Sequence, residues 1–210
     1  TAFQRDIFIR AYALSLSRVR VIGNVFQKVE SGKWKVESGW TTRTILWAGR
    51  MIPLKNLPLL VRVFKQLHAV DSSLRLRLVG DGPERSAISS LVASLGLSSA
   101  VTLVPTLSHD VLDEEICAAY CAALPSLTEI SPNFALRCVA LGTPIVLTSE
   151  TGIRDQFPDL IYVDPTDERG LVHVLERLLD PIEYAHYRGV FVRPHPSVSW
   201  SMIVDHYLAL

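Results

Sequence analysis

The feature that most constrains this chain is a regular alternation of short apolar runs with longer amphipathic stretches. The short runs are rich in Val, Ile and Leu and stop at Gly, Pro or Ser, which predicts strands. The stretches between them repeat apolar residues at helical spacing, as in the stripe that follows Asn56. The predicted strands are Thr44–Ala48, Leu74–Val79, Val101–Val104, Tyr120–Leu124, Pro144–Thr148 and Leu160–Val163.

This alternation is typical of βαβ units with right-handed crossovers. It predicts an α/β fold, a Rossmann-like doubly wound parallel sheet of about six strands with helices on both faces. The predicted helices follow Asn56, Pro83 and Asp167 (or Thr166), and cover residues 109–116 and 132–141. Outside this region we expect a helix over residues 2–17, a strand at Arg18–Val25, a loop over 27–42 and a last helix at about Ser199–Ala209.

Charge and cysteine content exclude several classes of protein. The 210 residues contain 21 Lys and Arg and 21 Asp and Glu, so no basic excess exists to bind nucleic acid or an anionic membrane. No apolar run reaches the roughly 18 residues of a transmembrane helix. The three cysteines, Cys117, Cys121 and Cys138, fit no zinc spacing and are expected to be free thiols in a reducing compartment.

In an open parallel sheet, ligands bind at the carboxyl ends of the strands, so the loops there are the places to look for a site. After the first strand come Arg50, a rigid donor fork, and Lys55, a point charge just before a helix. The pair predicts a clamp for a diphosphate, because a helix N-terminus already favours an anion. The alternative is that both side chains are solvated surface charges.

Three further loops hold candidate residues. Gly82, in Gly80-Asp81-Gly82-Pro83, either lets the backbone approach a ligand or makes a βα turn. Glu129 could accept hydrogen bonds from sugar hydroxyls, and Asn133 begins a helix whose N–H groups point at the rim. The alternative is that Glu129 is an exposed loop acid and Asn133 a turn residue.

The remaining candidates are Arg137 and His109. Arg137 lies one turn into a helix and either reaches the rim or lies along the helix surface, and His109 is the one histidine in a rim segment. The chain has no G-x-S-x-G elbow, no Walker A loop and no G-x-G-x-x-G sequence.

Taken in order, these loops resemble the retaining GT-B glycosyltransferases of family 4. LWAGRMIPLKNLPLLVRVF resembles their GR…K segment, and LRLRLVGDGPE resembles their GDGPE segment. The stretch from VTLVPTLSHD to TSETGI resembles their PS..E…G.P…G region, and SVSWSMIVDHYLAL their closing helix. The similarity is collinear from about residue 19 to 210 and covers the carboxy-terminal, donor-binding half of such an enzyme.

The resemblance implies roles for individual residues. Arg50 and Lys55 match the pair that binds the donor diphosphate, Glu129 matches the first acid of the E-x7-E motif that contacts the transferred sugar, and Gly152 lies in the loop facing the cleft. The second acid of that motif, which bonds the ribose hydroxyls, falls at Arg137, and arginine has no acceptor.

The resemblance also implies the organisation of the chain. Residues 1–18 would be a remnant helix of a missing amino-terminal acceptor domain, 19–196 the donor-binding domain, and 197–210 the closing helix. We expect a nucleotide-diphosphate-sugar donor, no cofactor, no metal requirement, a cytoplasmic location and little transfer without the amino-terminal domain. The alternatives are a degenerate, non-catalytic binding or scaffold module and a GT-B-like nucleotide-sugar epimerase.

Overall fold

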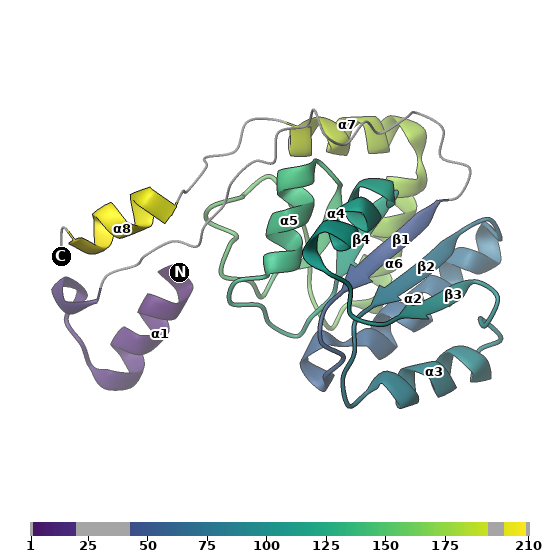
Figure 1. Ribbon diagram of the computed structural model, residues 1–210, viewed down its shortest axis with the longest axis horizontal. Coiled ribbons are helices and arrows are strands. Elements are labelled where there is room, and N and C mark those ends of the chain that lie inside the picture. The colour runs from purple at the N-terminus through teal and green to yellow at the C-terminus, as the bar shows by residue number, and fades with distance from the viewer. Residues whose placement is uncertain (1, 20–42, 193–199, 209–210) are drawn as a thin grey trace.

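The computed structural model describes residues 2–19, 43–192 and 200–208 (Figure 1). Its strands are β1 (Thr44–Ala48), β2 (Arg75–Val79), β3 (Val101–Val104), β4 (Cys121–Leu124), β5 (Ile145–Thr148) and β6 (Ile161–Val163). Its helices are α1 (Ala2–Tyr12), α2 (Leu57–Val70), α3 (Arg85–Ser94), α4 (His109–Ala118), α5 (Asn133–Leu141), α6 (Glu168–Leu179), α7 (Pro181–Val192) and α8 (Trp200–Leu208). Two short 3-10 turns cover Leu16–Arg18 and Pro53–Lys55.

The six strands form one parallel sheet in the order β3-β2-β1-β4-β5-β6, which confirms the predicted architecture. The chain builds outward from β1 to β3, then crosses to β4 on the other side of β1 and continues to β6. This reversal is the topological switch point of a doubly wound sheet, and ligands bind outside the strand ends there.

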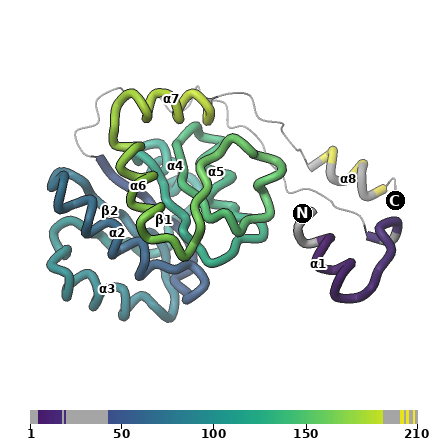
Figure 2. The backbone as a smooth tube through the Cα atoms, turned by 180° about the vertical axis from the view of Figure 1, so that it is seen from behind, coloured from purple at the N-terminus to yellow at the C-terminus, as the bar shows by residue number. Residues whose placement is uncertain are grey.

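Helices cover both faces of the sheet. α4 and α5 pack against each other in front of the sheet in Figure 1, whereas α2 contacts both α3 and α6. Figure 2, which shows the domain from behind, places α2 and α6 side by side on the opposite face from α4 and α5. The right-handed crossovers explain this division, because the reversal after β3 sends the next connection over the other face.

The inner strands of the sheet differ in burial. Every residue of β4 and β5 is buried, as expected of strands covered on both faces. β2, which like β5 lies one strand from the edge, alternates buried leucines with the half-buried Arg75 and Arg77. Arg77 Nη2 lies 2.6 Å from Glu115 Oε1 on α4, so its charge is paired.

One predicted helix is too long, and one helix was missed. The helix expected over residues 2–17 ends at Tyr12, because Ala13 takes a left-handed conformation (φ 50°) and Ser15 then caps a separate short turn. α7 was not predicted at all. It is held by Tyr184, whose ring stacks on Tyr120 with centroids 4.2 Å apart and whose hydroxyl donates to the Tyr120 carbonyl oxygen.

Other predictions need smaller corrections or lie beyond the described residues. Asn56 precedes α2 as predicted, but its side chain donates to the Pro165 carbonyl oxygen (3.0 Å) and caps nothing in α2. The predicted strand at Arg18–Val25 and loop at 27–42 lie outside the described residues, apart from Arg18 and Val19, which form the end of the 3-10 turn and its cap. No helix within the described ranges has the length and apolar character needed to cross a membrane.

Candidate functional site

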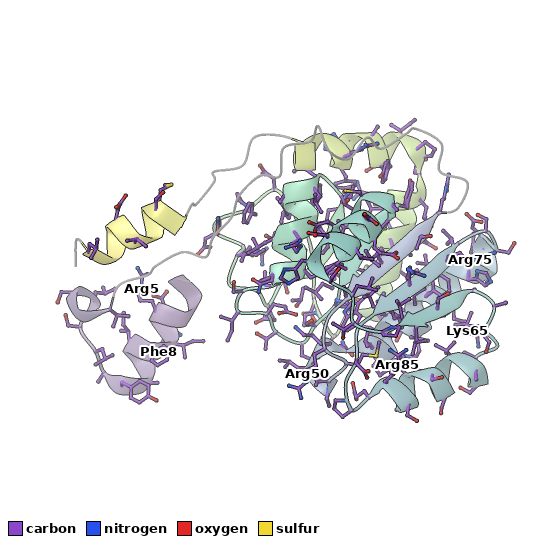
Figure 3. All side chains as sticks on the ribbon, viewed as in Figure 1. Arg5, Phe8, Arg50, Lys65, Arg75 and Arg85 are labelled. Atoms are coloured by element: carbon purple, nitrogen blue, oxygen red, sulfur yellow. The ribbon has the colours of Figure 1, made fainter. Side chains whose placement is uncertain are left out.

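The predicted site residues follow the carboxyl ends of parallel strands and therefore share one end of the sheet. Arg50 follows β1, Gly82 follows β2, Glu129 follows β4 and Gly152 follows β5. Figure 3 shows Arg50 and Arg85, which follow β1 and β2, at the end opposite Arg75, where β2 begins.

At the switch point, Lys55 and Glu129 form an ion pair. The Lys55 ammonium lies 2.5 Å from Glu129 Oε1, and the Ser126 hydroxyl donates to the same oxygen at 2.6 Å. The Glu129 side chain is 8% exposed and that of Lys55 is 20% exposed, so the pair is largely sheltered from water. Because both contacts use Oε1, the second carboxylate oxygen has no hydrogen bond among the described residues.

The backbone explains why these side chains meet. Pro53–Lys55 forms a 3-10 turn, and Asn56, in a left-handed conformation, redirects the chain into α2. The Leu127 N–H then donates to the Leu54 carbonyl oxygen (2.9 Å), which ties the loop after β4 to the loop after β1. The switch point thus brings Lys55 and Glu129 together through backbone contacts as well as charge.

Glu129 is also fixed to the loop after β5. Its N–H donates to the Glu150 carbonyl oxygen, and the Gly152 N–H donates to the Glu129 carbonyl oxygen, each at 2.8 Å. These bonds form a parallel bridge between Glu129 and Thr151. Gly152 therefore lies beside Glu129 and supports its backbone.

A cavity of about 370 Å³ opens at the same end of the sheet. Arg50, His109, Asn133 and Arg137 line it, whereas Lys55, Glu129, Gly82 and Gly152 do not. The Arg50 side chain is exposed and makes no hydrogen bond or ion pair with another described residue. Its donors are free to meet an anion at the cavity mouth.

The N-termini of α4 and α5 both face this cavity. His109 is the first residue of α4 and Asn133 the first of α5, and both line it. Neither helix has a side-chain hydrogen bond at its N-cap, Ser108 or Pro132. Free N–H groups and the helix dipole favour a negatively charged group at such an end.

The glycines after β2 serve the packing of two loops. A Cβ at Gly80 (φ +134°) would overlap the Gly49 carbonyl oxygen, and one at Gly82 (φ +154°) would overlap that of Met51. The Met51 N–H donates to the Asp81 carbonyl oxygen at 2.8 Å. Gly82 thus fits the alternative of a tight βα turn, while Gly80 also lines the cavity.

Arg137 reaches the cavity wall, with its guanidinium held by α4. Its Nε donates to Asp113 Oδ1 at 2.8 Å and its Nη2 to Asp113 Oδ2 at 2.6 Å. Sequence reasoning found neither Asp113 nor Ser126 as a partner. Nothing in the sequence marks Asp113, whereas the opposite charges of Lys55 and Glu129 on adjoining loops could have indicated their pairing.

Other reactive side chains near the site do not suit a role there. Burial raises the pKa of the Cys138 thiol on α5 well above its ordinary value, so it stays protonated. The three cysteines are free, as expected. Within the described residues, no group of three or more His, Cys, Asp or Glu side chains could hold a metal ion.

Comparison with known proteins places this geometry in a family. The family model for glycosyl transferases group 1 matches residues 42–181, which include the whole sheet, the Lys55–Glu129 pair and the cavity. The chain belongs to the group 1 glycosyltransferases. As one of these, it is 30% identical over 208 residues to a D-inositol 3-phosphate glycosyltransferase of Streptosporangium roseum. That alignment covers 91% of this chain and 46% of the relative, so this glycosyltransferase chain spans less than half of the relative's length.

Solved structures show the same fold. A Staphylococcus aureus TarM mutant, crystallised with fondaparinux, alpha-GlcNAc-glycerol and UDP, superposes with a TM-score of 0.81 at 14% identity. It is matched over 100% of this chain and 42% of that one. Sucrose-phosphate synthase from Thermosynechococcus elongatus gives a TM-score of 0.77 at 22% identity, over 98% of this chain and 55% of that one. The chain therefore has the fold of one half of a GT-B glycosyltransferase.

Proposed function

We propose that this chain is the donor-binding half of a retaining glycosyltransferase, which moves a hexose from a nucleotide-diphosphate sugar to an acceptor. The observation that carries the proposal is the meeting of Lys55 and Glu129 at the switch point, at the same sheet end as the cavity that Arg50 lines. The group 1 family match, and the relatives named as glycosyltransferases, support a nucleotide-sugar donor.

The cavity would take the nucleoside and its mouth the diphosphate. Arg50 and Asn133 line it, and the first-turn N–H groups of α4 and α5 add further donors for phosphate oxygens. When the bond between sugar and diphosphate breaks, negative charge grows on the diphosphate. Positive groups fixed beforehand stabilise that charge without having to reorganise, so Lys55 and the helix N-termini would lower the barrier to departure, and Arg50 would add positive charge once it contacts the diphosphate.

Glu129 would act on the sugar. One carboxylate oxygen is held by Lys55 and Ser126, which leaves the other to accept a hydrogen bond from a sugar hydroxyl. Lys55 would then contact both the acid and the diphosphate, and so fix the sugar relative to the bond that breaks. The acceptor would bind to the part of the glycosyltransferase that this chain does not include. Any peripheral contact with a membrane would also be made by that part.

A specific observation favours a second candidate, a degenerate domain that binds without catalysis. The position of the second E-x7-E acid holds Arg137, whose donors are directed to Asp113. An arginine cannot accept hydrogen bonds from a ribose, so a contact made in the resembling enzymes is lost. Nucleotide binding separates the two candidates only in part, and sugar transfer by the complete protein decides between them.

The first experiment is calorimetric titration of the chain with UDP and GDP, each alone and as its glucose conjugate. We expect one of the two nucleotides to bind, and Arg50→Ala to weaken its binding at least tenfold. Lys65→Ala is the matched control, since Lys65 is an exposed cation on α2 away from the cavity lining. The proposal fails if no nucleotide binds, or if both variants bind as the natural chain does.

A further inference from the structure

The guanidinium of Arg137 is held in one orientation by α4. Its Nε and Nη2 donate hydrogen bonds to the two carboxylate oxygens of Asp113, and Nη2 also donates to the His109 carbonyl oxygen at 3.2 Å. A guanidinium has five N–H donors, so these contacts leave the two on Nη1. The Asp113 side chain is only 13% exposed and that of Arg137 is 32% exposed.

Of the two residues in this ion pair, Arg137 lines the cavity and Asp113 does not. His109 also lines the cavity, and the carboxylate stands behind the guanidinium. The pair carries no net charge, and each oxygen of Asp113 already accepts a short hydrogen bond. Beside it, the wall is apolar, formed by Leu107, Leu112 and Phe134.

A ribose is usually selected through its hydroxyl groups. A carboxylate that accepts hydrogen bonds from the 2′-hydroxyl is one general way of doing so. Such a site rejects an analogue that lacks the hydroxyl, because the buried acceptor is then left unpaired. Here the Asp113 carboxylate is already satisfied by Arg137, and the two free donors on Nη1 belong to a side chain that is 32% exposed, so water can replace a missing ligand hydroxyl.

Among the described residues that line the cavity, the acid is Asp81. It is exposed, and its Oδ1 already accepts a hydrogen bond from the Gly82 N–H at 2.7 Å. An exposed acid can be solvated when a ligand hydroxyl is missing, so it discriminates weakly. Asp81 is nevertheless the residue to compare with Arg137 in any test.

We propose that this site does not depend on the 2′-hydroxyl of its nucleotide. It takes 2′-deoxyribonucleoside diphosphate sugars as well as ribonucleoside diphosphate sugars, and Arg137, oriented by Asp113, is the residue that sets this specificity. The inference rests on the proposed function, since it concerns the donor that the cavity binds.

The test compares UDP with 2′-deoxy-UDP, and GDP with 2′-deoxy-GDP, by calorimetric titration of the full chain. We expect the two members of the pair that binds to differ by no more than about threefold in Kd. The double variant Asp113→Arg, Arg137→Glu keeps an ion pair between α4 and α5 but puts the carboxylate on α5. It should prefer the ribonucleotide about tenfold or more, because a charged acceptor then meets the ribose.

A matched control inverts another ion pair of α4. Arg77 and Glu115 lie 2.6 Å apart, and the Arg77 side chain is 32% exposed, as is that of Arg137, but neither Arg77 nor Glu115 lines the cavity. Arg77→Glu with Glu115→Arg should leave the ratio of the two Kd values unchanged. Asp81→Asn should also leave it unchanged.

The outcomes separate the inference from the proposed function. If neither UDP nor GDP binds, the proposed function falls and this inference with it. A natural chain that binds the ribonucleotide ten times more tightly than its deoxy form overturns the inference alone, and loss of that preference in Asp81→Asn would assign the ribose to Asp81. The ratio of the Kd values for the deoxyribonucleotide and the ribonucleotide, measured on the natural chain, tests the inference even if the double variant Asp113→Arg, Arg137→Glu fails to fold.

Discussion

Lys55 and Glu129, 74 residues apart in the chain, are joined by a 2.5 Å ion pair across the point where the strand order reverses. Arg50, five residues before Lys55, lies on the cavity wall without any partner among the described residues. The two cations of the proposed clamp therefore differ in what they do before a donor arrives. Lys55 stabilises the fold of two loops, whereas Arg50 is free.

This difference predicts distinct effects of removing each cation. Lys55→Met should lower the free energy of unfolding by about 2–3 kcal/mol, because it leaves a buried carboxylate with only the Ser126 hydroxyl as a side-chain partner. Arg50→Ala should change it by less than about 0.5 kcal/mol, as is usual for an exposed residue. Urea denaturation measures both values, and equal losses would contradict the assignment.

The same two variants should both weaken binding of a nucleoside diphosphate. The expected loss is roughly 1.5–3 kcal/mol for each, the range for a hydrogen bond to a charged group. Calorimetric titration measures it, with Lys65→Ala as the control. If Lys55→Met binds as tightly as the natural chain, Lys55 serves only to hold Glu129 in place.

The glycine after Asp81 offers a test of the loop packing. Gly82→Ala should destabilise the chain by more than about 2 kcal/mol, because φ is +154° and the added Cβ would overlap the Met51 carbonyl oxygen. Gly189→Ala is the matched control. Gly189 lies in α7 with nothing within 4 Å of an added Cβ, so this change should stabilise by about 0.5–1 kcal/mol. A mild effect at Gly82 would mean that the loop relaxes away from Met51.

Much of the fold could be predicted from the sequence, because buried parallel strands are short apolar runs that end at Gly, Pro or Ser. β1 and β3 were placed to the residue, and the other four strands within one residue. α7 was missed because its sequence gives no clean apolar stripe: Ile182 is exposed, while Tyr184 and Phe191 face inward. Its position depends on the stack with Tyr120, a contact between residues far apart in sequence.

The location of the candidate residues at one end of the sheet could be predicted for the same reason. A parallel sheet brings its carboxyl ends together, so Arg50, Gly82 and Glu129 were expected at one edge and lie there. The pairing of Arg137 with Asp113 depends on how α4 packs on α5, which residue spacing does not determine. The cavity follows from the same packing.

Buried thiols and phenols should make the chain less stable in alkaline solution. Burial raises the pKa of Cys121 from 9.0 to about 12, the pKa of Tyr184 from 10.0 to about 12, and the pKa values of Cys138, Tyr120 and Tyr162 as well. The unfolded chain releases these protons first as pH rises, so stability present below pH 9 is lost as pH approaches 12.

The loss from Cys121 alone should approach about 1.4 kcal/mol per pH unit within that window. Urea denaturation at a series of pH values measures the slope of the free energy of unfolding against pH. Cys121→Ala should make this slope shallower by up to about 1.4 kcal/mol per pH unit, the contribution of one proton. A free energy of unfolding that stays level from pH 9 to 11 would show that these groups are not buried as described.

Asp113 neutralises Arg137 at the cavity wall. Asp113→Asn removes the negative charge but keeps the size of the side chain and one acceptor oxygen. The free energy of unfolding should fall by roughly 1.5–3 kcal/mol, since one of the two charged hydrogen bonds becomes weaker and the other is lost, because the amide nitrogen cannot accept. The guanidinium now faces the cavity as an unpaired cation, so pyrophosphate should bind severalfold more tightly than to the natural chain. This gain should shrink in high salt, because the added attraction is electrostatic.

Arg137→Glu should act in the opposite direction, since it puts a second carboxylate beside Asp113 and repels pyrophosphate. Titration of the three proteins with pyrophosphate at low and high salt orders their affinities. Equal affinities for all three would mean that the ion pair lies too far from the bound anion to affect it, and that the diphosphate contacts Arg50 without Arg137.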